Sequence, residues 1–200
     1  AMALEPTLYA PRNAIAFLEL ERGRFERYCD ALERIARDHP ELGWTHYELI
    51  DGYTVTGQPG KGRALESLAN ERYPELRNVN WPSAVLEATY GHPADAIARY
   101  RALAAFDPED RSYPISVGFT AASIGATDVA KAALDQAGVL DTPQYIVGHA
   151  WLFFALDDYA GASTWLRNAK VSPSLSLVRH ALQAQSLALA GRREQALREY

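Results

Sequence analysis

Two residue types recur in this chain at a fixed interval of 34 residues. Prolines stand at that interval at Pro6, Pro40, Pro74 and Pro108. Glycines follow the same interval at Gly23, Gly57, Gly91 and Gly125. Because a period of roughly 20–50 residues is typical of stacked repeats, this spacing constrains the fold more than any local pattern does.

Each repeat is predicted to contain a helix, a tight turn, a second helix and an exit loop. A repeat of this length holds two helices of about 12–14 residues, each roughly 20 Å long at about 1.5 Å per residue. The second helix of the first repeat shows the expected spacing, because Phe25, Tyr28, Leu32 and Ile35 form one apolar stripe. We therefore expect an all-α fold made of stacked helical pairs.

The period divides the chain into about six repeats. Their expected bounds are 9–42, 43–76, 77–110, 111–142, 143–174 and a partial 175–200, with 1–8 as the tail of a preceding helix. Gly138 is expected to end a helix early and so to shorten the fourth repeat. The fifth repeat carries Asp157 where the others carry a turn glycine. We expect residues 1–200 to form a single repeat domain that is a fragment of a longer protein.

A small residue follows the turn in every repeat after the first. These residues are Gly62, Ala96, Ala130, Ala162 and Ala196. We expect each to lie at a close contact between helices that only a small side chain fits.

The recurring pattern resembles the tetratricopeptide repeat, most plainly in residues 90–100 and 187–200. Its features are a small residue before the turn, glycine in it, alanine after it, an aromatic residue or leucine four places later, and a closing proline. The resemblance covers nearly the whole chain, with departures at Tyr28, Ser83 and Asp157. It implies an α-solenoid wound as a right-handed superhelix, in which each repeat buries its apolar face against its neighbours.

Composition argues against several classes of protein. A formal net charge of −5 disfavours a protein that reads nucleic-acid backbones. The one cysteine, Cys29, excludes an internal disulfide framework and fits a reducing, cytoplasmic setting. The long apolar run at 150–156 is too short to span a bilayer. The abundance of alanine and arginine is a hint of a bacterial source.

The sequence predicts no catalytic, metal or cofactor site, and we expect no enzyme. The histidines are His39, His46, His92, His149 and His180. They lie mostly in separate repeats, without a pair at ligand spacing. The glycine-rich turn at 57–62 lacks the spacing of a phosphate loop and the Ser or Thr that should follow Lys61.

In the tetratricopeptide family the first helices line a concave surface that receives peptides. The resemblance places on this surface Asn13, Phe17, Trp44, Tyr47, Asp51, Trp81, Val85, Ile115, Phe119, Val147, Trp151, Phe154 and Gln185. Large aromatic residues are the usual anchors of recognition surfaces, although any one of them can instead pack between helices. Some family members grip a carboxylate here with basic residues, but the matching positions are mostly aromatic or apolar. An apolar or mixed peptide is therefore the expected ligand.

Two functions remain open from the sequence. In the first, the chain is a scaffold that binds a peptide or partner protein in its concave groove. In the second, it is the sensory or regulatory segment of a larger bacterial transcription regulator or enzyme, and acts by ligand binding or self-association. Partial end repeats predict exposed apolar faces and hence a homodimer through the ends. We expect no direct nucleic-acid partner and no membrane insertion.

Overall fold

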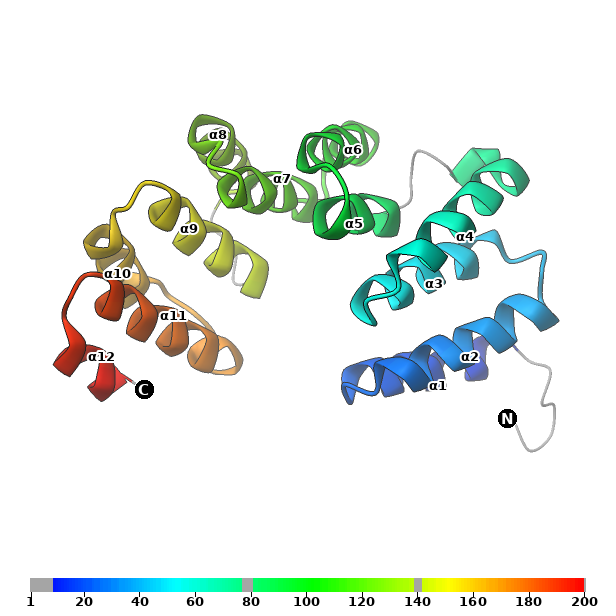
Figure 1. The fold of residues 1–200 in the computed structure, drawn as a ribbon, viewed down its shortest axis with the longest axis horizontal. Helices are drawn as coiled ribbons and strands as arrows, with labels where there is room; N and C mark the ends of the chain where they lie inside the picture. The colour runs from blue at the N-terminus through cyan, green and yellow to red at the C-terminus, as the bar shows by residue number, and fades with distance from the viewer. Residues whose placement is uncertain (1–8, 77–80, 139–141, 200) are drawn as a thin grey trace. The chain divides into compact units, whose positions relative to one another are not determined.

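The computed structural model describes residues 9–76, 81–138 and 142–199, and the predicted helix tail at 1–8 lies outside them. All regular structure in these ranges is helical (Figure 1). Contacts divide the chain into two compact units, Ala1–Ala96 and Ile97–Tyr200. We describe each unit by itself.

The first unit contains α1 (Tyr9–Glu21), α2 (Phe25–Asp38), α3 (Gly43–Val55), α4 (Pro59–Arg72), η1 (Pro74–Leu76) and α5 (Trp81–Tyr90). Helix α6 (Pro93–Phe106) begins in the first unit and continues in the second. The second unit contains α7 (Ser112–Ser123), α8 (Thr127–Ala137), α9 (Pro143–Ala155), α10 (Tyr159–Asn168), η2 (Pro173–Leu175), α11 (Ser176–Leu189) and α12 (Arg193–Glu199). The second helices α2, α4, α6 and α8 begin 34 residues apart, at Phe25, Pro59, Pro93 and Thr127, whereas the starts of the first helices are less regular. The repeat bounds and the single-domain organisation remain predictions.

Tight turns join the two helices of a repeat, and most use a backbone conformation that favours glycine. Gly23, Gly57 and Gly125 have positive φ angles of 69°, 70° and 73°. Asp157 has a φ of 54° and so takes the place of glycine in its turn, as expected. Gly91 is in register with these residues but is not among those with a positive φ. Its turn contains a different contact, in which the backbone N–H of His92 donates to Glu87 at 3.2 Å.

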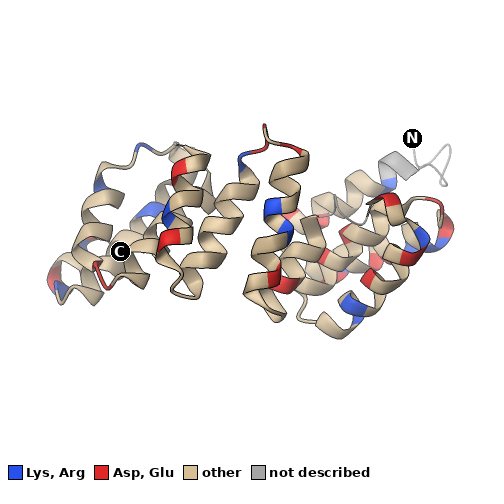
Figure 2. Cartoon of the chain, turned by 90° about the horizontal axis from the view of Figure 1, so that it is seen from above, with Lys and Arg blue, Asp and Glu red and all other residues tan. Residues whose placement is uncertain are grey.

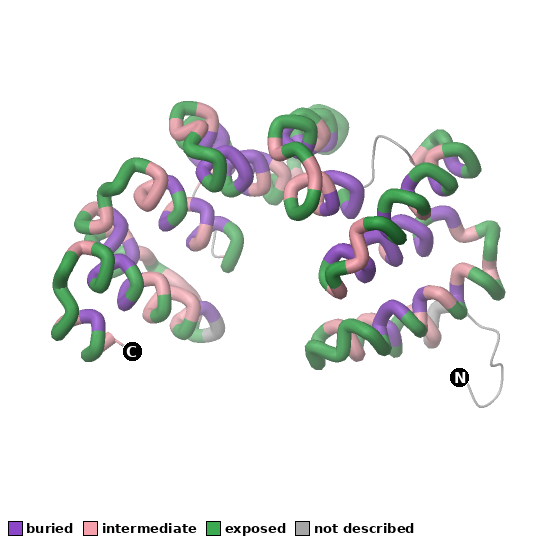
Figure 3. Tube along the Cα trace, in the orientation of Figure 1, coloured by how far each residue is buried: buried purple, intermediate pink, exposed green. Residues whose placement is uncertain are grey.

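Helices α3, α7 and α9 each pack against their own second helix and against the first helix of the next repeat. In the first unit α3 contacts α4 and α5, and in the second unit α9 contacts α7, α10 and α11. Buried positions recur along the packed sides of the helices (Figure 3). This nearest-neighbour packing is typical of stacked helical repeats.

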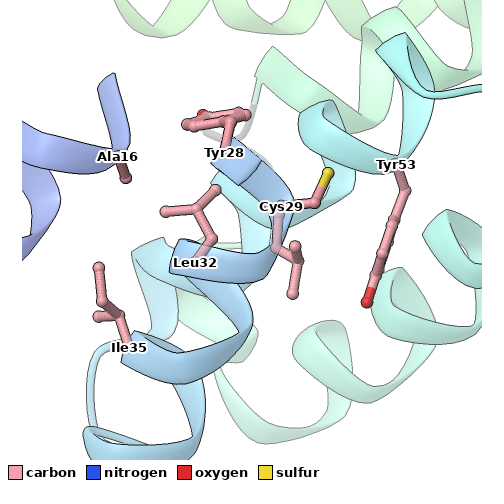
Figure 4. Close-up of a cluster of buried hydrophobic side chains, with 7 residues drawn as sticks. Ala16, Tyr28, Cys29, Leu32, Ile35 and Tyr53 are labelled. Carbon is pink, nitrogen blue, oxygen red and sulfur yellow. The ribbon is translucent and has the colours of Figure 1, made fainter. Parts of the chain in front are cut away.

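The core of the first repeat shows how the apolar stripe of α2 is used. Leu32 and Ile35 lie toward Ala16 of α1, whereas Cys29 faces α3 (Figure 4). The thiol of Cys29 fills the space beside Gly52, where an added Cβ would lie 2.8 Å from the sulfur. Cys29 is thus a buried free thiol that packs in the core of the first repeat.

The small residues of the repeat register are all buried, as predicted. Gly62 shows the reason most clearly, because a Cβ at this position would lie 3.3 Å from both terminal methyl groups of Leu86. A larger side chain would therefore have to push α4 and α5 apart.

Charges of both signs are interspersed along the described helices (Figure 2). The part of the chain with described structure contains no group of three or more His, Cys, Asp or Glu side chains arranged to hold a metal ion. No helix there combines the length and the apolar character that crossing a membrane requires.

Candidate functional site

Two exposed aromatic rings meet where α7 packs against α9. Phe119 of α7 is 38% exposed and Trp151 of α9 is 40% exposed. Their ring centroids are 6.2 Å apart, with the rings nearly perpendicular at 84°. Gly148 brings the helices close at this point, because a Cβ there would lie 3.8 Å from the Cβ of Phe119. The edge-to-face arrangement is one that aromatic pairs favour.

The row of rings continues toward α10. The centroid of Phe154 is 6.3 Å from that of Trp151, and the centroid of Tyr159 is 5.9 Å from that of Phe154. Phe154 also packs against the buried core of the second unit. We call Phe119, Trp151, Phe154 and Tyr159 the aromatic surface. It spans two consecutive repeats, so its shape depends on how those repeats pack.

A carboxylate lies at one end of the aromatic surface. The hydroxyl of Tyr159 donates to Oδ1 of Asp157 at 2.8 Å. This hydrogen bond raises the pKa of Tyr159, so the phenol stays protonated at neutral pH. Asp157 itself is exposed. The surface therefore offers apolar rings along most of its length and a negative charge at one end.

Two more predicted residues lie on the helices of the second unit. Val147 lies one turn before Trp151 on α9 and is half-buried. Gln185 is exposed on α11, which packs against α9. Neither has a recorded ring or hydrogen-bond contact with the aromatic surface.

In the first unit the exposed face of α3 is partly acidic. Trp44, Glu48 and Asp51 share one face because they are four and three residues apart. Trp44 is 48% exposed. Burial raises the pKa of Asp51 and that of Glu48, whose carboxylate accepts a hydrogen bond of 2.9 Å from the Tyr28 hydroxyl. This face combines an aromatic ring with two carboxyl groups that are costly to ionise.

The other predicted residues of the first unit are less open to solvent, except Trp81. Asn13 and Phe17 are half-buried on α1, and the Phe17 ring lies 5.9 Å from that of Tyr28. Val85 is half-buried on α5, whereas Trp81 at the start of this helix is 40% exposed.

Two predicted surface residues lie in the core. Tyr47 and Ile115 are each only 2% exposed. The Tyr47 hydroxyl donates to Oδ1 of Asn70 on α4 at 3.0 Å, so its polar end is turned toward the second helix of its own repeat. Ile115 packs with Ala137 and Tyr145. Tyr47 and Ile115 therefore pack between helices and do not line a binding surface.

Sequence reasoning missed two residues of these faces. Tyr159 is the first residue of a second helix, and only first helices were expected to line the surface. The sequence feature that could have identified Tyr159 is the turn at Asp157. This turn places the first residue of α10 in ring contact with Phe154. Glu48 was missed although it lies one helical turn from Trp44, the spacing that marks a shared face.

Comparison with known proteins supports the fold. No protein-family model and no curated protein matches the sequence. The structure is similar to the crystal structure of a tetratricopeptide repeat protein from Parabacteroides merdae, with a TM-score of 0.63. The sequences are 14% identical, and the likeness covers 96% of this chain and 77% of the other. The predicted fold class is confirmed, since the chain is an all-α helical-repeat solenoid whose fold is similar to that of a tetratricopeptide repeat protein.

Proposed function

We propose that this chain is a protein-interaction scaffold that binds a peptide segment of a partner on the aromatic surface. Helical-repeat folds present extended surfaces that serve binding. The observation that carries the proposal is the continuous row of four rings, of which Phe119 and Trp151 remain well exposed. Rigid aromatic side chains offer large contact area at a low cost in conformational entropy, and they dominate the energetics of recognition.

The chemistry of the surface limits what the peptide is like. An apolar or aromatic side chain would pack against the exposed parts of Phe119 and Trp151. A basic side chain placed toward the other end would meet Asp157, which carries a negative charge and is solvent-accessible. The proposed ligand is thus a peptide segment with an apolar anchor and a basic residue.

The experiment is a selection of random peptides displayed on phage, followed by affinity measurements on the selected peptides. Two matched double variants test the predicted surface residues of each compact unit separately. Phe119→Ala with Trp151→Ala removes exposed rings of the second unit, and Trp44→Ala with Trp81→Ala removes those of the first. All proteins must first show cooperative thermal unfolding, so that a loss of binding is a loss of contact.

We expect the selection to enrich peptides that contain an apolar anchor. The second-unit variant should bind these peptides at least about tenfold more weakly than the parent, a loss of roughly 1.4 kcal/mol of binding free energy. The first-unit variant should bind nearly as well as the parent. Loss confined to the first-unit variant would move the site to the face of Trp44 and Asp51. Unchanged binding in both variants would overturn the proposal.

We place the scaffold in a reducing, cytoplasmic setting. Cys29 is the one cysteine of the chain and is buried as a free thiol. Burial raises the pKa of Cys29, which keeps the thiol protonated and unreactive. Such a residue suits a compartment in which disulfide exchange is not required for folding.

A further inference from the structure

A pocket of about 280 Å³ lies in the second unit, away from the aromatic surface. Tyr145 and Ile146 of α9 form one wall, and Trp165 and Asn168 of α10 form the other. Residues 169–171, which follow α10, complete it. The volume is close to the lower end of the range for sites that take small molecules, roughly 300–1,000 Å³.

The pocket and Trp151 of the aromatic surface lie on different sides of α9. Successive residues of a helix are rotated by about 100°, so positions two apart point in nearly opposite directions. Tyr145 borders the pocket, and His149 follows it by one turn. Val147 and Trp151 are each two residues further along and therefore face another way. None of the four residues of the aromatic surface lines the pocket, although Phe154 packs against the same buried cluster as Trp165 and Val171.

The ring of His149 holds the two aromatic residues of the pocket wall, Tyr145 and Trp165, in place. The ring of His149 stacks on that of Trp165, with centroids 4.7 Å apart and an angle of 18° between the planes. Tyr145 meets the same His149 ring edge-on at 4.5 Å. Nε2 of His149 is buried and has no hydrogen-bond partner in the described structure, and burial lowers the pKa of this histidine. His149 thus acts as a neutral packing ring that fixes Trp165 and Tyr145.

A wall fixed in this way favours binding because little has to be ordered when a ligand enters. Ile146 belongs to a buried core cluster against which Trp165 and Val171 pack. The apolar part of the pocket is therefore preformed. The Tyr145 and Trp165 rings are themselves in tilted contact, with centroids 6.3 Å apart, so they line the pocket side by side and leave no slot between them.

The polar groups of the pocket set the charge of its ligand. Asn168 and Lys170 are both exposed and stand on the same border, one offering an amide and the other an ammonium group. The carbonyl end of α10 also lies here, but a helix terminus carries only about half an elementary charge, less than the full charge of Lys170. Asp135, the acidic group with an electrostatic effect on Tyr145, is paired with Lys131 at 2.7 Å. The border of the pocket therefore attracts an anion.

We infer that this pocket binds a small aromatic carboxylate, whose ring packs against the apolar lining that Ile146, Trp165 and Val171 provide and whose carboxylate is held by Lys170 and Asn168. Such binding makes the chain a sensing segment, which is the second class of function left open by the sequence. It does not depend on the proposed peptide-binding function.

The test measures binding of phenylacetate to the full 200-residue chain by isothermal titration calorimetry, with tryptophan fluorescence as a second readout. Phenylacetamide has the same ring without the charge and reports the contribution of the carboxylate. Lys170→Gln removes the charge of the pocket at an exposed position, and Lys61→Gln removes an exposed lysine of the other compact unit. Ala169→Leu reduces the pocket volume from a position on its border.

We expect phenylacetate to bind with one site per chain, and at least about tenfold more weakly in Lys170→Gln, while Lys61→Gln binds like the parent. Phenylacetamide should bind the parent more weakly than phenylacetate does, and Ala169→Leu should weaken both. No binding of phenylacetate at millimolar concentration would overturn the inference, as would equal binding by the parent and Lys170→Gln. A peptide ending in phenylalanine that binds more tightly than phenylacetate would assign the pocket to a peptide end and overturn the small-molecule assignment.

Discussion

Asp157 adopts a left-handed backbone conformation, with a φ of 54°, where the corresponding residues Gly23 and Gly125 have φ angles of 69° and 73°. For a residue with a Cβ this conformation costs about 1–2 kcal/mol, and Asp and Asn tolerate it best because their side chains form local hydrogen bonds. Glycine avoids the steric cost. It lowers the stability of the folded chain by about 0.4–1 kcal/mol, because it increases the conformational entropy of the unfolded chain. The two effects partly cancel, and the steric cost is the larger.

Asp157→Ala should therefore be less stable than Asp157→Gly by about 0.5–1 kcal/mol. Both substitutions remove the hydrogen bond from Tyr159, so the comparison isolates the backbone conformation. Urea unfolding followed by circular dichroism measures the difference. Equal stability of the two variants would mean that the turn does not impose a left-handed residue in solution.

Burial raises the pKa of Asp51 above its ordinary value of 3.8. The folded chain then binds this proton more tightly than the unfolded chain does. The resulting contribution to stability is fully present below pH 3.8 and is lost as the pH rises through the raised pKa. Asp51→Asn cannot ionise, so its free energy of unfolding should increase relative to the parent between about pH 4 and pH 7.

Urea unfolding at a series of pH values tests this expectation. Asp30→Asn removes an exposed carboxylate from α2 in the same compact unit and controls for the general effect of net charge. A stability difference between Asp51→Asn and the parent that stays constant with pH, or that follows the Asp30→Asn control, would contradict the assigned role of burial.

Helix α7 packs closely on α8 because it carries glycine at the contact. A Cβ on Gly118 would lie 2.6 Å from Cγ of Leu134 and 3.3 Å from the backbone oxygen of Ala130. The backbone atom cannot move aside as a flexible side chain can. Gly118→Ala should therefore lower the free energy of unfolding by about 1–3 kcal/mol, although alanine is the better helix former.

Gly60→Ala is the matched control for this prediction. Gly60 lies near the start of α4, and a Cβ there would meet nothing within 4 Å. Its substitution should be neutral or stabilise the chain by up to about 1 kcal/mol through helix propensity. The pair is compared by urea unfolding. Stabilisation by Gly118→Ala as well would show that α7 and α8 are less tightly packed than the structure indicates.

The sequence was sufficient to predict the helical pairs because turn glycines and small contact residues are set by local backbone geometry. Gly125 in its turn and Ala130 after it each serve the role that the register assigned to them. Gly91 is the exception, since a glycine in register does not have to adopt the left-handed conformation. The register gives the position of a turn, but neighbouring contacts decide its conformation.

The candidate site was less predictable. Trp44 and Tyr47 are both aromatic and lie three residues apart on α3, yet one is exposed and the other is buried. The difference comes from the next helix, because Asn70 of α4 accepts the Tyr47 hydrogen bond. Residue type and register cannot distinguish such neighbours. Their exposure depends on the packing of α3 against α4, which is known only once the helices are assembled.

At the scale of the molecule, stacked repeats cover each other's apolar faces, and a face without a neighbour stays exposed. Leu177 of α11 and Leu197 of α12 are 80% and 71% exposed. Both belong to the second compact unit, near the last described helix. Exposed apolar groups on a repeat protein favour association, and the homodimer predicted through the end repeats would bury them.

We therefore expect the 200-residue chain to self-associate as its concentration rises, and to stop doing so when Leu177→Glu and Leu197→Glu are combined. Two buried charges in each partner would oppose association by several kcal/mol, because charges are costly to remove from water without partners. Sedimentation velocity over a range of concentrations measures the effect. Leu68→Glu is the control, since Leu68 of α4 is also half-exposed but lies in the other compact unit. If the double variant associates like the parent, the contact lies elsewhere; if Leu68→Glu alone abolishes association, the first unit forms it.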